Sequence, residues 1–83
     1  MDESQRREER VSAQLRYLRE EMGLSGAVAR SADIARVLGL SSADALRMRI
    51  RRGTCPVRVT RDGAEYVALV RDLAEYLARL EES

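Results

Sequence analysis

The chain has 83 residues, of which 45% are hydrophobic and 35% charged, and its formal net charge is +1. A chain this short buries only about 60% of its unfolded surface, so we expect a single domain, residues 1–83, with one small core. It contains neither a run of about 18 apolar residues nor a signal-peptide pattern, which predicts a cytoplasmic protein without membrane contact. Cys55 is the only cysteine, which excludes an intrachain disulfide and favours a reducing compartment.

The charge is unevenly distributed along the chain. All 15 basic residues are arginine, and residues 47–61 hold six of them without a single acid, whereas the other residues hold nine arginines and 14 acids. Segregation of this kind produces a local positive field and is typical of nucleic-acid binding. On charge alone, a well-solvated helix face explains the arginine run equally well.

Residues 2–22 are predicted to form a helix, because apolar residues recur at helical spacing on one stripe. The stripe consists of Val11, Leu15, Leu18 and Met22. We expect it to pack against its own domain. The alternative is a homodimer seam, since the same spacing suits pairing between helices, and this alternative also applies to the C-terminal helix. The small, weakly patterned stretch 24–30 is predicted to be a loop.

The segment 31–53 is predicted to form two short helices joined by a tight turn. Ser31 is the expected N-cap of the first helix, which Gly39 ends. Ser41 or Ser42 is the expected N-cap of the second helix, which continues to the end of the segment. Two helices in this arrangement have the layout of a helix-turn-helix.

The second of these helices has one apolar side, where Leu46 and Ile50 share an arc and are expected to face the core. Its arginines then flank that arc or project away from it: Arg47 and Arg49 on the flanks, Arg51 and Arg52 on the outer side. A basic helix placed in this way fits a major groove, where arginine donates two hydrogen bonds to guanine while its neighbours hold phosphates.

Residues 57–69 are predicted to form a β-hairpin after Pro56 has ended the helix. The alternation in 57–60 indicates a half-buried strand, and Asp62-Gly63 is a strong signal for a type I′ turn. With that loop, Val59 lies opposite Tyr66 and Val57 opposite Ala68, Arg58 falls on the other face, and Arg61 sits at the tip. A last helix is expected over 70–81, with Val70, Leu73, Leu77 and Leu80 on one stripe.

Three stretches resemble the winged helix-turn-helix of MerR-like and excisionase-type (AlpA-like) DNA-binding proteins. They are DIARVLGLS at 33–41, the RRG-x-x-P pattern from Arg51 to Pro56, and VRVTRDG at 57–63 leading to DLAEYL at 72–77. The resemblance covers residues 31–80, and the ending is also similar to phage pyocin-activator proteins. It implies a helix that reads the major groove and a hairpin wing on the backbone or minor groove. The stretch 39–53 is one residue longer than the family pattern, which leaves the base-contacting positions open by one residue.

An enzymatic or metal-binding role is not expected. The chain has no histidine and no Gly-rich phosphate loop, and its acids lie on predicted surface faces or at helix ends. Cys55 has no second cysteine or histidine with which to build a metal site and is expected to be a small packing residue. We therefore expect no cofactor.

Together these patterns predict a mainly α fold with a small β-hairpin, a winged helix-turn-helix with an extra N-terminal helix and a C-terminal helix. The expected function is sequence-specific binding of double-stranded DNA by a small transcriptional regulator or an architectural factor of a phage or plasmid. The expected DNA-binding residues are Ser41, Ser42, Arg47, Arg49, Arg51, Arg52, Arg58 and Arg61. The alternative is a protein-interaction module whose basic surface docks an acidic partner.

Overall fold

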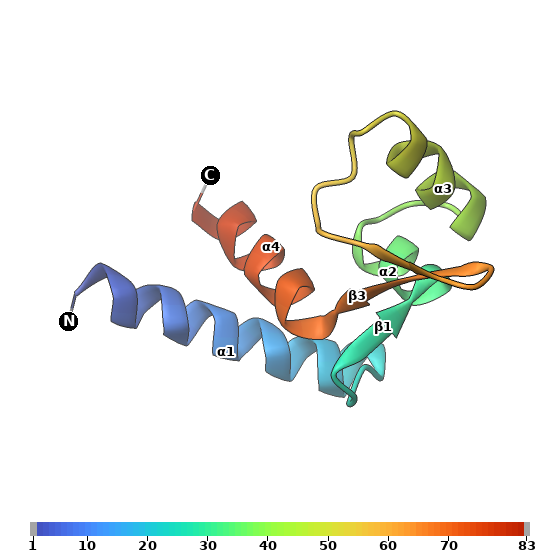
Figure 1. The fold of residues 1–83 in the computed structure, drawn as a ribbon. Coiled ribbons are helices and arrows are strands. Elements are labelled where there is room, and N and C mark those ends of the chain that lie inside the picture. Colours follow the sequence, from blue (N-terminus) through green and yellow to red (C-terminus); the bar gives the residue numbers. More distant parts are fainter. Residues whose placement is uncertain (1, 83) are drawn as a thin grey trace.

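The structure, a computed structural model, describes residues 2–82 and over that range contains four helices and one three-stranded antiparallel sheet (Figure 1). In chain order the elements are α1 (Glu3–Met22), β1 (Val28–Arg30), α2 (Ser31–Val37), α3 (Ala43–Arg51), β2 (Thr60–Asp62), β3 (Glu65–Leu69) and α4 (Val70–Glu82). All four predicted helices are confirmed. The prediction of a hairpin alone was incomplete, because the sheet has a third strand, and the fold is a small mixed α and β arrangement.

The additional strand is β1, which lies in the stretch that was predicted to be a loop. It pairs with β3 in the register Val28↔Leu69 and Ala29↔Ala68, so the strand order is β1-β3-β2. Ala29 and Ala68 are both buried, on the face of the sheet that packs towards the helices. A strand of three residues with alanine as its buried residue is too short and too weakly hydrophobic to produce an alternating pattern.

The hairpin turn lies one residue later than predicted. Asp62 pairs with Glu65 and Arg61 with Tyr66, so the loop is Gly63-Ala64 instead of Asp62-Gly63. Gly63 has a φ of +64°, and no non-glycine residue among residues 2–82 has a positive φ. Glycine at the first loop position alone is the pattern of a type II′ turn, whereas the type I′ turn would require Asp62 to adopt a positive φ as well.

The shifted turn also changes the strand that leads into it. Val59 does not oppose Tyr66, and residues 57–59 lie outside β2, which begins at Thr60. Val57 is nevertheless buried in the main core, and Val59 packs against that core. The apolar side of the predicted strand is therefore retained, but it is presented by an irregular segment.

Helices α1 and α4 pack side by side at the end of the molecule that carries both termini (Figure 1). Val11 and Leu18 of α1 are buried within the chain, which confirms that the N-terminal stripe packs against its own domain. Leu15 and Met22 pack against the same core. In α4 the predicted stripe is divided, because Val70, Leu73 and Leu77 contact the core whereas Leu80 is 52% exposed. Its inward face carries Val70, Leu73, Ala74 and Ala78.

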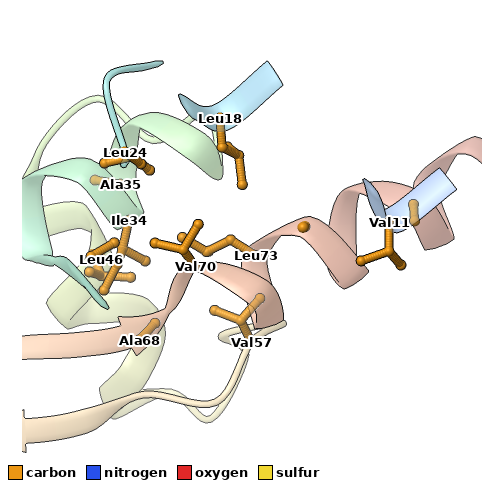
Figure 2. Close-up of a cluster of buried hydrophobic side chains, with 13 residues drawn as sticks. Val11, Leu18, Leu24, Ile34, Ala35, Leu46, Val57, Ala68, Val70 and Leu73 are labelled. Atoms are coloured by element: carbon orange, nitrogen blue, oxygen red, sulfur yellow. The ribbon is translucent and has the colours of Figure 1, made fainter. Parts of the chain in front are cut away.

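One core joins this pair of helices to the sheet and to α2 and α3 (Figure 2). Figure 2 shows Leu46 of α3 beside Ile34 of α2, with Val70 and Leu73 of α4 next to them. Leu46 is fully buried and Ile50 packs against the core, which confirms the predicted inward arc of α3. Helix α3 packs mainly on α2, so these apolar contacts hold it in place.

Ser31 does not cap α2 as predicted. The N-cap is Arg30, without a side-chain hydrogen bond, and Ser31 is the first residue of the helix, with only 1% of its surface exposed. The Ser31 Oγ instead accepts a hydrogen bond of 2.9 Å from the Tyr66 N–H in β3. Strand β1 ends at Arg30, so the serine hydroxyl supplies the partner that the sheet does not provide beyond that point.

Candidate nucleic-acid interface

Helix α3 is capped at both ends by specific hydrogen bonds. The Ser42 Oγ accepts from the Ala45 N–H at 3.1 Å, so Ser42 is the N-cap and Ser41 is an exposed turn residue. At the other end Gly53 has a φ of +71°, and the Thr54 N–H donates to the Arg49 carbonyl at 2.9 Å. These are the contacts of a Schellman motif, which satisfies the last carbonyls of a helix. The two caps therefore define where the helix begins and ends.

The outer side of α3, opposite Leu46, is formed by residues at helical spacing. Its exposed members are Asp44, Met48, Arg51 and Arg52. Arg47 is half-buried on one flank, and Arg49 is exposed on the other. Asp44 and Met48 were not among the predicted site residues, which were chosen by positive charge, although the position of Leu46 on the helical wheel places both on this side.

Three arginines at the C-terminal end of α3, the last of them the C-cap, have no carboxylate partner in the described part of the chain. Arg49, Arg51 and Arg52, below called the α3 arginines, make no ion pair with any residue from 2 to 82. They cluster around the C-terminal end of the helix, where positive charge is favoured by the helix dipole. Arg47 differs, because its guanidinium is paired with the Asp44 carboxylate three residues earlier.

The two predicted arginines of the hairpin segment lie on different sides of the sheet. Arg61 pairs with Tyr66 and so shares the face of β3 that also carries the buried Ala68, and its Nε donates to the Gly63 carbonyl at 3.0 Å. Arg58 instead lines two surface hollows whose other walls come from α4 and the sheet, with Asp72 in both. One of these hollows is also lined by Val28, Val67 and Leu69, which lie on the face of the sheet opposite Ala68.

Arg30 is a basic residue beside the hairpin that the sequence analysis did not select. Its Nη1 lies 3.5 Å from Asp62 Oδ2, which links the end of β1 to the hairpin. Both side chains are more than half exposed, so the ion pair contributes little to stability. Only the pairing of β1 with the sheet brings Arg30 to this position.

The arginines between α1 and α4 face acids on the opposite helix. Arg10 pairs with Glu82, and Arg71 Nη2 lies 2.8 Å from Glu8 Oε1. The hydrogen bond and the charge of Glu8 raise the pKa of Arg71 above its ordinary value, with a smaller contribution from Glu75. These guanidinium groups are already engaged with carboxylates and do not form a free positive surface.

Other chemistry has little support in the described part of the chain. No three His, Cys, Asp or Glu side chains among residues 2–82 are grouped so that they would hold a metal ion. Cys55 is half-buried, and its Sγ donates to the Val57 carbonyl at 3.4 Å. Within the same residues, no helix has the length and apolar character that crossing a bilayer requires.

Comparisons with protein-family models, with curated proteins and with solved structures find no match to this chain. The case for a function therefore depends on the residues and geometry described above.

Proposed function

We propose that the chain binds double-stranded DNA as a winged helix-turn-helix protein, with α3 in the major groove and the β2–β3 hairpin as the wing. Its role would be that of a small transcriptional regulator or an architectural factor of a mobile element. The observation that carries the proposal is a helix, capped at both ends, whose exposed side and C-terminal end present three arginines without a carboxylate partner among residues 2–82.

The dimensions and connections of α3 support this proposal. Helix α3 has nine residues and is about 13 Å long, and an α-helix with its side chains, about 10–12 Å across, fits a major groove about 12 Å wide. Helix α2 ends at a turn in which Gly39 has a φ of +74°, and α3 packs on α2 through its apolar side. The opposite side of α3 is left open to a ligand.

The ion pairing of the arginines also supports the proposal. A guanidinium that already pairs with a carboxylate must give up that contact before it binds a phosphate, whereas the α3 arginines have no such contact to lose among residues 2–82. Phosphate binding by arginine releases condensed counterions and supplies much of the affinity for DNA.

Further contacts would come from the start of α3 and from the hairpin. The exposed Ser41 and the O–H of Ser42 would donate to phosphates, because capping uses Ser42 Oγ only as an acceptor. Arg61 would contact the backbone from the wing. Arg58 lies towards α4 and is not included in the proposed contacts.

A homodimer through the C-terminal helix is part of the proposal. Val11 and Leu18 are buried within the chain, so they are not available as a seam, whereas Leu80 of α4 is 52% exposed. Dimers of this kind bind half-sites about one helical turn apart. Sedimentation at micromolar concentration tests this part, and a purely monomeric protein would contradict it. The proposal also keeps the chain in the cytoplasm, where the thiol of Cys55 would remain reduced.

The proposal is tested by selecting bound fragments from random duplex DNA and then titrating the selected duplex at two salt concentrations, with polyglutamate as a competitor. We expect a shared sequence among the selected fragments and an affinity that falls steeply with salt. Absence of any complex at low salt would contradict DNA binding. Equal competition by polyglutamate would favour the alternative, a basic surface that docks an acidic protein.

A further inference from the structure

A single acid lies within the arginine-rich side of α3. Asp44 is the only acid in this helix, and no acid occurs between it and Asp62. Its side chain is 88% exposed, on the same outer side as Met48 and Arg51. A surface that served only to attract phosphates would gain from a neutral or basic residue at this position.

Capping of the helix does not explain Asp44. Ser42 performs that role through the Ala45 N–H, and Arg47 is the only hydrogen-bond partner of the Asp44 side chain among residues 2–82. In α1, by contrast, an aspartate is itself the cap, because Asp2 accepts from the Gln5 N–H at 2.9 Å. Asp44 retains only the general preference of acids for the first turn of a helix.

The pair formed by Asp44 and Arg47 has the chemistry of base reading. A carboxylate in the major groove accepts a hydrogen bond from the cytosine amino group, and arginine donates two hydrogen bonds to guanine. The same carboxylate repels phosphates and so disfavours contacts that carry no sequence information. The ion pair also holds the half-buried Arg47 guanidinium against the exposed outer side of the helix.

We infer that Asp44 is a specificity-determining residue of α3: it accepts a hydrogen bond from a cytosine in the major groove and positions Arg47 for a neighbouring guanine. This inference rests on the proposed DNA binding. The two halves of α3 then have different tasks. The N-terminal half distinguishes bases, and the α3 arginines near the C-terminal end supply phosphate contacts. The selected DNA site must contain a cytosine that depends on Asp44.

The test compares Asp44→Ala and Asp44→Asn with the matched control Asp33→Asn. Asp33 also lies in the first turn of a helix and also pairs with an arginine three residues on, Arg36, at 2.9 Å, but it belongs to α2. Dissociation constants are measured for the selected duplex, for random duplex, and for duplexes in which each C·G pair is changed to T·A or A·T. Thermal unfolding of each variant shows whether the fold is retained.

We expect Asp44→Ala to bind random duplex more tightly and to lose about tenfold in the ratio of selected to random affinity. At one cytosine position, the change from C·G to T·A or A·T should no longer weaken binding. Asp44→Asn should prefer adenine at that position, because asparagine pairs with the adenine N6 and N7 edge. Asp33→Asn should change neither the ratio nor the preferred base.

The outcomes separate this inference from the proposed function. A wild-type protein that discriminates sequences, together with an Asp44→Ala protein that keeps the same ratio at every position, overturns the role of Asp44 and leaves DNA binding intact. Equal losses in Asp44→Ala and Asp33→Asn that follow their thermal stability indicate a helix-stabilising acid and also overturn it. A wild-type protein that binds no duplex removes both proposals.

Discussion

The two ends of this molecule differ in where acids lie relative to their arginines. Between α1 and α4, arginines such as Arg10 and Arg71 are matched with glutamates of the facing helix, and the two helices together carry seven arginines and nine acids. On α3 the arginines at the C-terminal end have no such partner among residues 2–82. The number of arginines in a helix therefore does not tell how many are free of an ion pair, whereas the position of the acids relative to them does.

The largest effect should come from the apolar support of α3. Leu46→Ala removes a fully buried side chain and should lower the free energy of unfolding by about 2–5 kcal/mol. Urea titration followed by circular dichroism measures the loss. Leu69→Ala in β3, at a position that is 52% exposed, is the control and should cost much less. Similar losses in both variants would mean that α3 is not anchored by Leu46.

The next effect separates the two ends by their charge. Changing the α3 arginines together to glutamine should lower the slope of log K against log salt by about 2.7 and weaken DNA binding about a hundredfold near 0.15 M salt. The matched control changes three arginines of α1 to glutamine, which alters the net charge by the same amount but away from α3. They are Arg6, Arg16 and Arg19. Equal weakening by the two triple variants would show that only total charge matters.

A smaller effect is expected at the junction of α2 and β3. Ser31→Ala leaves the half-buried Tyr66 N–H without its 2.9 Å partner, which should cost about 1–3 kcal/mol of stability. Faster hydrogen exchange of the Tyr66 amide would locate the change. Ser41→Ala, at an exposed turn residue, serves as the control. An unchanged exchange rate at Tyr66 would contradict the role assigned to this hydroxyl.

The smallest effect should follow from breaking an ion pair between α1 and α4. Arg71→Gln, Glu8→Gln and the double variant should each lower the thermal midpoint only slightly, because exposed ion pairs contribute little. Their affinity for DNA should equal that of the wild type. A marked loss of DNA binding in Arg71→Gln alone would show that this end also takes part in binding, and the contrast between the two ends would no longer hold.

The sequence predicts the four helices and the inward side of α3 because these depend on local periodicity and on caps. Leu46, Ile50 and the glycine stop at Gly53 are examples, and the structure confirms all three. The choice between Ser41 and Ser42 stayed open, since both have the same capping chemistry. Only the hydrogen bond to the Ala45 N–H distinguishes them.

What the sequence does not predict depends on pairing between distant residues. β1 exists because Val28–Arg30 lies beside β3, some 40 residues later in the chain, and Ser31 turns from a cap into a bridge for the same reason. The hairpin turn lies one residue later than predicted, because Gly63 is the first loop residue and adopts the only positive φ in the loop. Among the candidate site residues, Arg58 lies on the face that hairpin alternation predicts for it, but its place beside Asp72 of α4 depends on how α4 packs and is not contained in that alternation.

The hydrogen bond between Ser31 and Tyr66 ties the first residue of α2 to strand β3. Because α3 packs on α2 and the hairpin continues from the sheet, this bond links the proposed reading helix to the proposed wing. Where the spacing of the two does not match a straight duplex, the DNA would have to bend. A site with a flexible pyrimidine–purine step between the two contacts would then be favoured at bases that the protein never touches.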